Sequence, residues 1–129
     1  MPRVMVIDDS ALMRKILRKH LEEAGHEVDD WLPLSPFEIP ERIAAFQPDL
    51  VLSDYQMPGV NGASVAKMAQ KAKPELPVII LTALRDPDVE AQLRRFGVKA
   101  ILSKPLEGAQ LVSAVQELLG GAGQLEGRV

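Results

Sequence analysis

Short apolar runs recur along this chain at a nearly regular interval, and they restrict its fold more than any other feature. Four of them are continuous and rich in branched side chains: Val4–Ile7, Leu50–Leu52, Val78–Leu81 and Ala100–Leu102. Continuous runs of this kind are typical of parallel strands that are buried on both faces of a sheet. A fifth segment, Glu27–Trp31, is more polar and suits the edge of a sheet. The sequence therefore predicts five strands.

Segments with helical periodicity lie between these strands. Ser10 and Gly25 suit the two ends of the first helix, and Asp86 followed by a proline suits the start of the fourth. We expect the second helix to begin near Ile39, because three prolines between 33 and 40 shorten it. The other four helices show these apolar stripes: Met13, Ile16, Leu17, Leu21 and Ala24; Val65, Met68, Ala69 and Ala72; Val89, Leu93 and Phe96; Leu111, Ala114, Val115, Leu118 and Leu119.

Strand and helix alternate five times, which predicts an α/β fold with right-handed crossovers and helices on both faces of the sheet. Five strands favour a doubly wound parallel sheet of order 2-1-3-4-5, the flavodoxin-like arrangement, with the polar second strand at an edge. The length of 129 residues leaves room for one domain. We assign residues 1–119 to it and expect the glycine-rich residues 120–129 to form a flexible tail or the stub of a linker.

Composition argues against several function classes. The formal net charge of −3 gives no footprint for nucleic acid. The chain has no cysteine, which removes disulfides, thiol catalysis and thiolate metal sites and is compatible with a reducing compartment. No apolar run approaches the roughly 18 residues that a membrane span needs. We therefore expect a soluble cytoplasmic domain that contacts neither nucleic acid nor membrane.

Three carboxylates follow two of the predicted strands. Asp8 and Asp9 come after the first strand, and Asp54 comes at the end of the third. Ligands of an open parallel sheet bind beyond the carboxyl ends of the strands where the strand order reverses, which here is between these two strands. A single Asp at such a place is more often a helix cap or a turn residue. Three crowded acids raise one another's pKa unless a cation neutralises them, and oxygen ligands suit Mg²⁺. The sequence predicts a Mg²⁺ site.

Two other strand ends contribute polar groups to the same edge. Thr82 closes the fourth strand and offers a hydroxyl, and Lys104 follows the fifth. Alone, each would be read as a solvated surface residue. Beside three carboxylates, Lys104 is instead suited to bind a phosphoryl group as a point charge. Acids, hydroxyl and lysine together indicate phosphoryl transfer to an aspartate.

At this point the sequence resembles a known family, the receiver domains of two-component response regulators. The resemblance covers residues 3–119 and rests on five pieces in a fixed order. These are Ile7-Asp8-Asp9-Ser10, Leu52-Ser53-Asp54, Met57-Pro58-Gly59-Val60-Asn61-Gly62, Leu81-Thr82-Ala83 and Leu102-Ser103-Lys104-Pro105. Each piece alone is weak evidence, whereas the ordered set is specific.

The resemblance implies a role for each site residue. Asp54 would accept a phosphoryl group from a phosphohistidine of a histidine kinase or a histidine phosphotransfer protein. Asp9 would bind Mg²⁺ directly and Asp8 through water, and the backbone carbonyl of Gln56 would be a further ligand. Thr82 would bind the phosphoryl group.

The resemblance also implies that Lys104 pairs with the phosphoryl group and that a cis peptide joins it to Pro105. The signal would leave through the face made by the fourth helix, the fifth strand and the fifth helix, with Thr82 and residue 101 as the switch. Most of the family has an aromatic side chain three positions before the lysine, and this chain has Ile101. The departure concerns the switch and leaves the acceptor site intact.

Such a domain would react stoichiometrically and would not be a turnover enzyme. Its downstream target would be another protein or a fused output domain, and a phosphorylation-dependent homodimer is a further option. One alternative is a phosphorylation-independent binding module, although such receivers generally lack one of the acids or the lysine. Another is an aspartate-nucleophile phosphatase, which usually carries its two acids two residues apart, where this chain has Asp8 and Ser10.

The sequence also leads to expectations for its histidines and for one basic patch. We expect His20 to pack at the buried border of the first helix and His26 to face water in the turn after Gly25. Arg14, Lys15, Arg18 and Lys19 lie on the first helix. They form either a solvated face or a contact for the phosphotransfer domain of a kinase.

Overall fold

The computed structural model describes residues 1–127, with side chains described through Gly120. Its elements are, in order, β1 (Arg3–Ile7), α1 (Ala11–Glu23), β2 (Glu27–Trp31), α2 (Glu38–Phe46), β3 (Leu50–Asp54), β4 (Gln56–Met57), β5 (Val60–Asn61), α3 (Gly62–Ala72), β6 (Val78–Thr82), α4 (Pro87–Arg95), β7 (Val98–Ser103) and α5 (Gly108–Gly127). Of these described helices, none combines the length and the apolar character that crossing a membrane requires.

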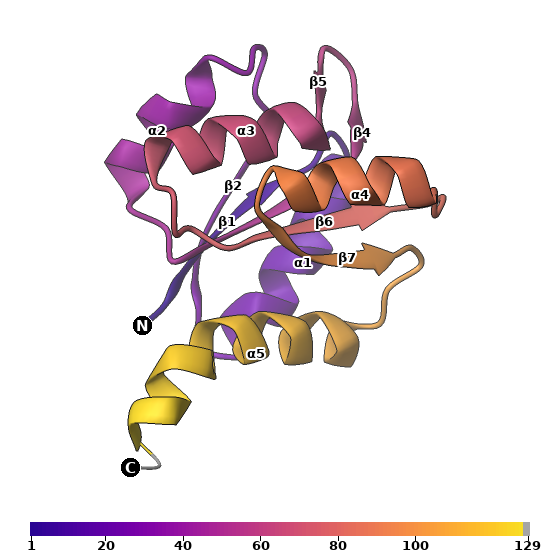
Figure 1. Cartoon of the computed structure of the whole chain (residues 1–129). Coiled ribbons are helices and arrows are strands. Elements are labelled where there is room, and N and C mark those ends of the chain that lie inside the picture. The colour runs from indigo at the N-terminus through magenta and orange to yellow at the C-terminus, as the bar shows by residue number, and fades with distance from the viewer. Residues whose placement is uncertain (128–129) are drawn as a thin grey trace.

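Five strands form one parallel sheet in the order β2-β1-β3-β6-β7, which confirms the predicted doubly wound arrangement. Helices α2, α3 and α4 cover one face, and α1 and α5 cover the other (Figure 1). Successive residues of a strand point to opposite faces, so β1 supplies Met5 and Ile7 to one core and Val4 and Val6 to the other. Most residues of the apolar helix stripes meet these faces of the sheet, although Ile16 of the stripe predicted for α1 is exposed.

Helix starts follow the capping residues that the sequence offers. The Ser10 hydroxyl accepts a hydrogen bond from the Met13 N–H at 3.1 Å, and Asp86 caps α4 ahead of Pro87. Helix α2 begins at Glu38, one residue before the expected start. These side chains satisfy amide donors that a helix start otherwise leaves unpaired.

The end of α1 corrects the expectation that His26 faces water, because only 5% of its surface is exposed. Gly25 adopts a left-handed conformation (φ +95°) and donates to the Glu22 carbonyl, while the His26 N–H donates to the Leu21 carbonyl. These two hydrogen bonds turn the chain back under α1, and His26 is thereby buried. Burial lowers the pKa of His26. His20 is half-buried and packs against Gly108, as expected.

Two features lie outside the sequence predictions. A two-stranded hairpin, β4 with β5, follows the main strand β3, and Gly59 in its turn has φ +77°. Helix α5 continues to Gly127, past the end of its apolar stripe at Leu119. Residues 128–129 lie outside the described part of the chain, and the flexible character predicted for residues 120–129 stays a prediction.

Candidate functional site

The carboxyl ends of four strands bring the predicted site residues to one edge of the sheet. Neighbouring strands align Ile7 with Ser53 and Asp54 with Leu81, so the residues that follow β1 lie beside the end of β3. Thr82 ends β6 in register with Ser103 of β7, the residue before the predicted lysine. Strand order reverses between β1 and β3, so the switch point of the sheet lies where the sequence placed it.

The three predicted acids come together at this edge. Asp8, Asp9 and Asp54 each offer a carboxylate oxygen, and these oxygens lie within 4.8 Å of one another. Asp8 and Asp54 are buried, with 1% and 8% of their surfaces exposed, whereas Asp9 is exposed. The cluster is therefore open to solvent on one side and closed by protein on the other.

Asp8 is the most deeply buried of the three acids. Its Oδ1 accepts a hydrogen bond from the Ser10 N–H at 2.9 Å, and its Oδ2 has no hydrogen-bond partner in the described structure. Burial raises the pKa of Asp8, and the Ser10 hydrogen bond and the charge of Lys104 act against that rise. A buried carboxylate oxygen that accepts no hydrogen bond and lies beside two further acids fits a divalent cation with oxygen ligands.

Lys104 supplies the positive charge of the site. Its Nζ lies 3.1 Å from Asp54 Oδ1 and 3.8 Å from Asp8 Oδ2. The backbone N–H of Lys104 donates to the Thr82 carbonyl at 2.8 Å, which fixes the lysine at the end of the sheet. The predicted cis peptide between Lys104 and Pro105 is present.

Thr82 lies at the predicted strand end, but its hydroxyl is engaged with its own loop. The Oγ1 donates to the Leu84 carbonyl at 2.8 Å and accepts from the Leu84 N–H at 3.3 Å. The side chain is 9% exposed. A role in binding a phosphoryl group therefore requires the hydroxyl to leave the Leu84 carbonyl.

Two more of the predicted residues lie close to this edge. Gln56 opens the short strand β4, paired with Asn61, and its side chain is exposed. The role of its carbonyl as a ligand stays a prediction. Ile101 is 6% exposed and lines a cavity of about 210 Å³ together with Thr82 and Tyr55.

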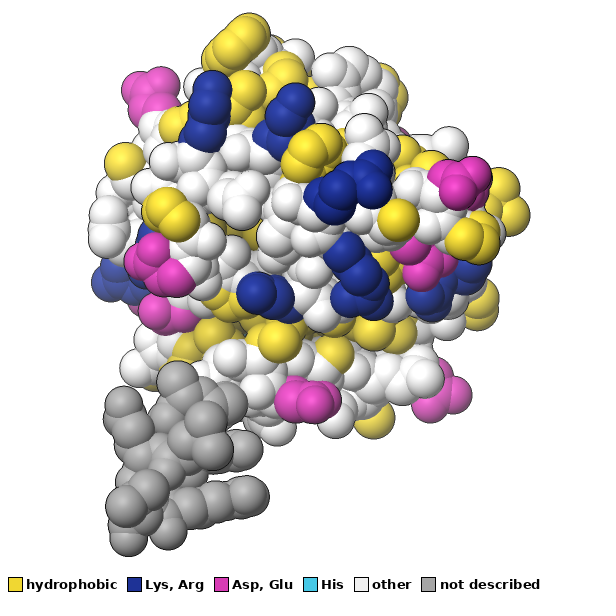
Figure 2. Space-filling view, viewed as in Figure 1, with side chains coloured by type: hydrophobic (Ala, Val, Ile, Leu, Met, Phe, Trp, Pro, Cys, Tyr) yellow, Lys and Arg dark blue, Asp and Glu magenta, His cyan; other side chains and the backbone are white. Residues whose placement is uncertain are grey.

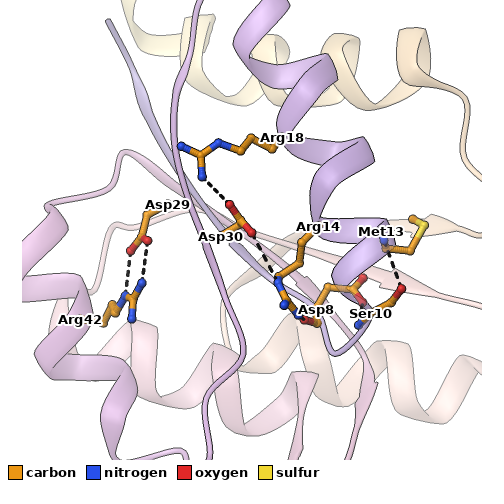
Figure 3. Close-up of polar contacts among 8 residues, drawn as sticks. All are labelled: Asp8, Ser10, Met13, Arg14, Arg18, Asp29, Asp30 and Arg42. Atoms are coloured by element: carbon orange, nitrogen blue, oxygen red, sulfur yellow. Dashed lines mark hydrogen bonds and ion pairs between the residues drawn. The ribbon is translucent and has the colours of Figure 1, made fainter.

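Arg14 is a residue whose part in the site the sequence reading missed. Its Nη1 donates to the Asp8 backbone carbonyl at 2.6 Å, and its Nε lies 3.4 Å from Asp30 Oδ2 (Figure 3). Asp30 also pairs with Arg18 Nη1 at 2.6 Å. Arg14 thereby ties the start of the acidic pair to β2. A sequence signal for this contact was available. The polar edge strand carries two adjacent acids, Asp29 and Asp30, and the helix before it carries two arginines four residues apart.

Comparison with known proteins decides what kind of domain carries this site. The sequence model of the response regulator receiver domain matches residues 4–116, which is most of the chain. The chain belongs to this family. Receiver domains serve two-component signalling systems, so the resemblance seen in the ordered sequence pieces is confirmed.

Individual receiver proteins are similar along nearly the whole chain. The polar-differentiation response regulator DivK of Brucella ovis is 31% identical over 92% of this chain and 97% of its own length. A receiver domain structure from Clostridium thermocellum superposes with a TM-score of 0.83 at 26% identity and covers 97% of this chain and 99% of its own. The DNA-binding transcriptional regulator NtrC of Escherichia coli K12 is 33% identical over 90% of this chain, which spans only 24% of NtrC.

Proposed function

We propose that this receiver domain accepts a phosphoryl group on Asp54 in the presence of Mg²⁺. The observation that carries the proposal is the contact of Asp54 with Lys104 Nζ at 3.1 Å, beside two further acids. Asp54 is the one acid of the cluster that contacts the lysine at this distance among the described residues. A carboxylate held by a cation next to a metal-binding pair is the arrangement that phosphoryl transfer needs.

The acids fit Mg²⁺ on chemical grounds. They are hard oxygen donors, few in number, and one member is exposed, so that a bound ion could keep several of its waters. Mg²⁺ held by Asp8, Asp9 and Asp54 would neutralise the crowded carboxylates and the incoming phosphoryl oxygens. The Gln56 carbonyl is proposed as a further ligand.

Asp54 acts as the nucleophile of the transfer step. One of its carboxylate oxygens forms a bond to phosphorus while the bond between phosphorus and the donor histidine nitrogen breaks. The electron pair of that bond stays on the imidazole, whose second nitrogen carries the proton that keeps the leaving histidine neutral. Lys104 then pairs with a phosphoryl oxygen, and the Thr82 hydroxyl turns from Leu84 to donate to another.

The proposed partners follow from this chemistry. The donor is a histidine kinase or a histidine phosphotransfer protein, and the α4–β7–α5 face passes the signal to a downstream protein, a fused output domain or a second phosphorylated copy. Two alternatives remain to be tested, a binding module that needs no phosphate and a phosphatase. All four charged residues of the site are present and converge, which favours the acceptor over the binding module.

The experiment is phosphorylation by acetyl phosphate, followed by intact mass. We expect the gain of one phosphate with Mg²⁺, no gain with EDTA, and no gain in Asp54→Asn. Asp49→Asn is the matched control, because Asp49 is an exposed aspartate outside the cluster, and it should be labelled normally. Label that persists in Asp54→Asn would move the acceptor elsewhere. Turnover of p-nitrophenyl phosphate would favour the phosphatase.

A further inference from the structure

A groove along α3, bounded by Pro36 in the loop before α2 and by Phe96 just after α4, is the strongest feature of the molecule that phosphoryl transfer does not use. We propose that it docks an acidic, amphipathic segment of a partner protein. The groove has a volume of about 410 Å³ and lies on the face of the sheet that carries α2, α3 and α4 (Figure 1). It is separate from the acidic cluster and from the cavity beside Ile101.

The floor of the groove is apolar and preformed. Pro36, Met68 and Phe96 line it, and the last two also pack against the hydrophobic core. Gly97 has φ +90°, and a Cβ there would lie 3.1 Å from the Gln70 side chain, so the end of α4 is held close to α3. A cavity with apolar walls on two packed helices can receive large side chains of a partner without rearrangement.

The rim of the groove is basic. Lys67 and Lys71 lie one turn apart on α3, both exposed, and Lys67 Nζ lies 5.2 Å from the centre of the Phe96 ring. No acidic side chain is among the described residues that line the groove. Figure 2 shows several Lys and Arg side chains over the middle of this face, Asp and Glu side chains mostly nearer its margins, and a group of hydrophobic side chains at its top. The local charge is thus opposite to the net charge of the chain.

The apolar surface extends beyond the groove along the loop before α2. Leu34 and Phe37, on either side of Pro36 in the chain, are 87% and 78% exposed. This exposure belongs to an ordered loop, because the Glu38 carboxylate accepts hydrogen bonds from the N–H groups of Leu34 and Ser35. Large exposed apolar side chains that adjoin a groove mark an interaction surface.

The charge pattern selects the occupant. A symmetric pair of copies would bring the lysine rim of one molecule onto the same lysines of the other, and like charges oppose such a contact. A bilayer surface cannot enter a concave groove. A helix with large apolar side chains on one face and carboxylates beside them satisfies both the floor and the rim.

The test uses a synthetic helical peptide of about 18 residues with leucine and phenylalanine on one face and glutamate on the other. Amide shifts of the unphosphorylated protein are followed by NMR during titration. We expect shifts at residues 34–37, 64–71 and 96, and binding that weakens with salt. Failure of phosphorylation at Asp54 would not affect this result, so the two proposals fail separately.

Charge reversal provides the matched variants. Lys67→Glu with Lys71→Glu should weaken binding about tenfold. The control is Lys15→Glu with Lys19→Glu, which has the same spacing on exposed positions of α1. It should change the affinity for the peptide less than about twofold. Phe37→Ser, which alters an exposed residue, should also weaken binding. Equal loss in the α1 control, equal binding of a lysine-for-glutamate peptide, self-association through the groove, or capture by anionic vesicles instead of the peptide would each overturn the proposal.

Discussion

Asp8 is the residue at which the site most opposes the stability of the fold. It is 1% exposed, and burial raises its pKa above the ordinary aspartate value. The folded protein therefore holds a proton on Asp8 more tightly than the unfolded chain does. The contribution of Asp8 to the free energy of unfolding therefore falls as pH rises from the ordinary aspartate pKa through the raised pKa of the folded protein, and the full cost is present above that range.

Removing that charge should stabilise the protein without metal. We predict that Asp8→Asn raises the free energy of unfolding at pH 7 in EDTA by about 1 kcal/mol, since a buried charge is removed whose attraction to Lys104 at 3.8 Å offsets only part of the cost of burying it. Mg²⁺ at ten times its Kd should stabilise the wild type by about 1.4 kcal/mol and the variant by much less. Urea unfolding followed by the fluorescence of buried Trp31 measures both.

Glu117→Gln is the control for this prediction, because it removes a negative charge at an exposed position of α5. The free energy of unfolding of Glu117→Gln in EDTA should equal that of the wild type, and Mg²⁺ should raise it by the same amount as in the wild type. A less stable Asp8→Asn protein in EDTA would show that the charge of Asp8 contributes more, through its attraction to Lys104, than its burial costs.

At the scale of elements, β6, β7 and α4 enclose a cavity of about 210 Å³ beside Ile101. Thr82 and Leu84 line the same cavity, so the space adjoins the residue whose hydroxyl would turn in the proposed phosphoryl transfer. Isoleucine is branched at Cβ and stiff at its first torsion, and it fills less of such a space than an aromatic ring does. The switch of this protein therefore has unfilled volume.

An aromatic side chain at position 101 should enter that volume. We predict that Ile101→Phe changes the free energy of unfolding by less than about 1.5 kcal/mol, whereas Ile80→Phe costs about 1–3 kcal/mol or more. Ile80 is the register neighbour of Ile101 on β6, is fully buried and is not among the residues lining the cavity. Urea unfolding compares the two variants. Equal destabilisation would mean that the cavity cannot admit the ring.

Most elements could be predicted from the sequence because each carried its own local signal. Ser10, Gly25 and Asp86 marked helix ends, and the apolar runs marked the strands. The hairpin of β4 and β5 has two residues in each strand, too few for periodicity. The prediction for His26 was wrong. A glycine at a helix end suggested an exposed turn, whereas the hydrogen bonds of the Gly25 and His26 N–H groups to carbonyls of α1 fold the chain back and bury His26.

The candidate site also has features that the sequence predicts and features that it does not. Asp8, Asp54 and Lys104 were predictable because parallel strands place their carboxyl ends together. The present partner of Thr82, the Leu84 carbonyl, is a choice between rotamers that no pattern records. The brace from Arg14 to Asp8 and Asp30 depends on the distance between α1 and β2, which the packing of the fold sets.

For the whole molecule, the size of the phosphoryl signal limits the response. A hydrogen bond to a charged group is worth about 1.5–3 kcal/mol, and converting a two-state equilibrium from 1:99 to 99:1 needs about 5.5 kcal/mol. Under the proposed function, Thr82 alone therefore could not drive a full change of the α4–β7–α5 face, and Lys104 would have to contribute through a rearranged ion pair. Ile101 leaves the cavity partly empty and therefore adds little to the free-energy difference between the two states of this face.

We predict that phosphorylation shifts this face only in part in the isolated domain. Amide shifts of residues 86–97 and 100–102 in the beryllofluoride complex should lie between two limits set by the free protein and by a partner-bound form. In the Ile101→Phe protein the same amide shifts should lie closer to those of the partner-bound form. Complete conversion of the wild type would contradict the prediction, and no change at all would support a module that works without phosphate.

The ion pairs on β2 have a consequence for how this molecule behaves in a crowded solution. Asp29 binds Arg42 of α2 through two hydrogen bonds of 2.8 and 2.9 Å, and Asp30 binds arginines of α1 (Figure 3). β2 is an outer strand, and outer strands invite pairing with strands of other molecules. A strand added there would have to lie along paired charges on both of its faces. The charges on β2 thereby oppose aggregation through this edge of the sheet.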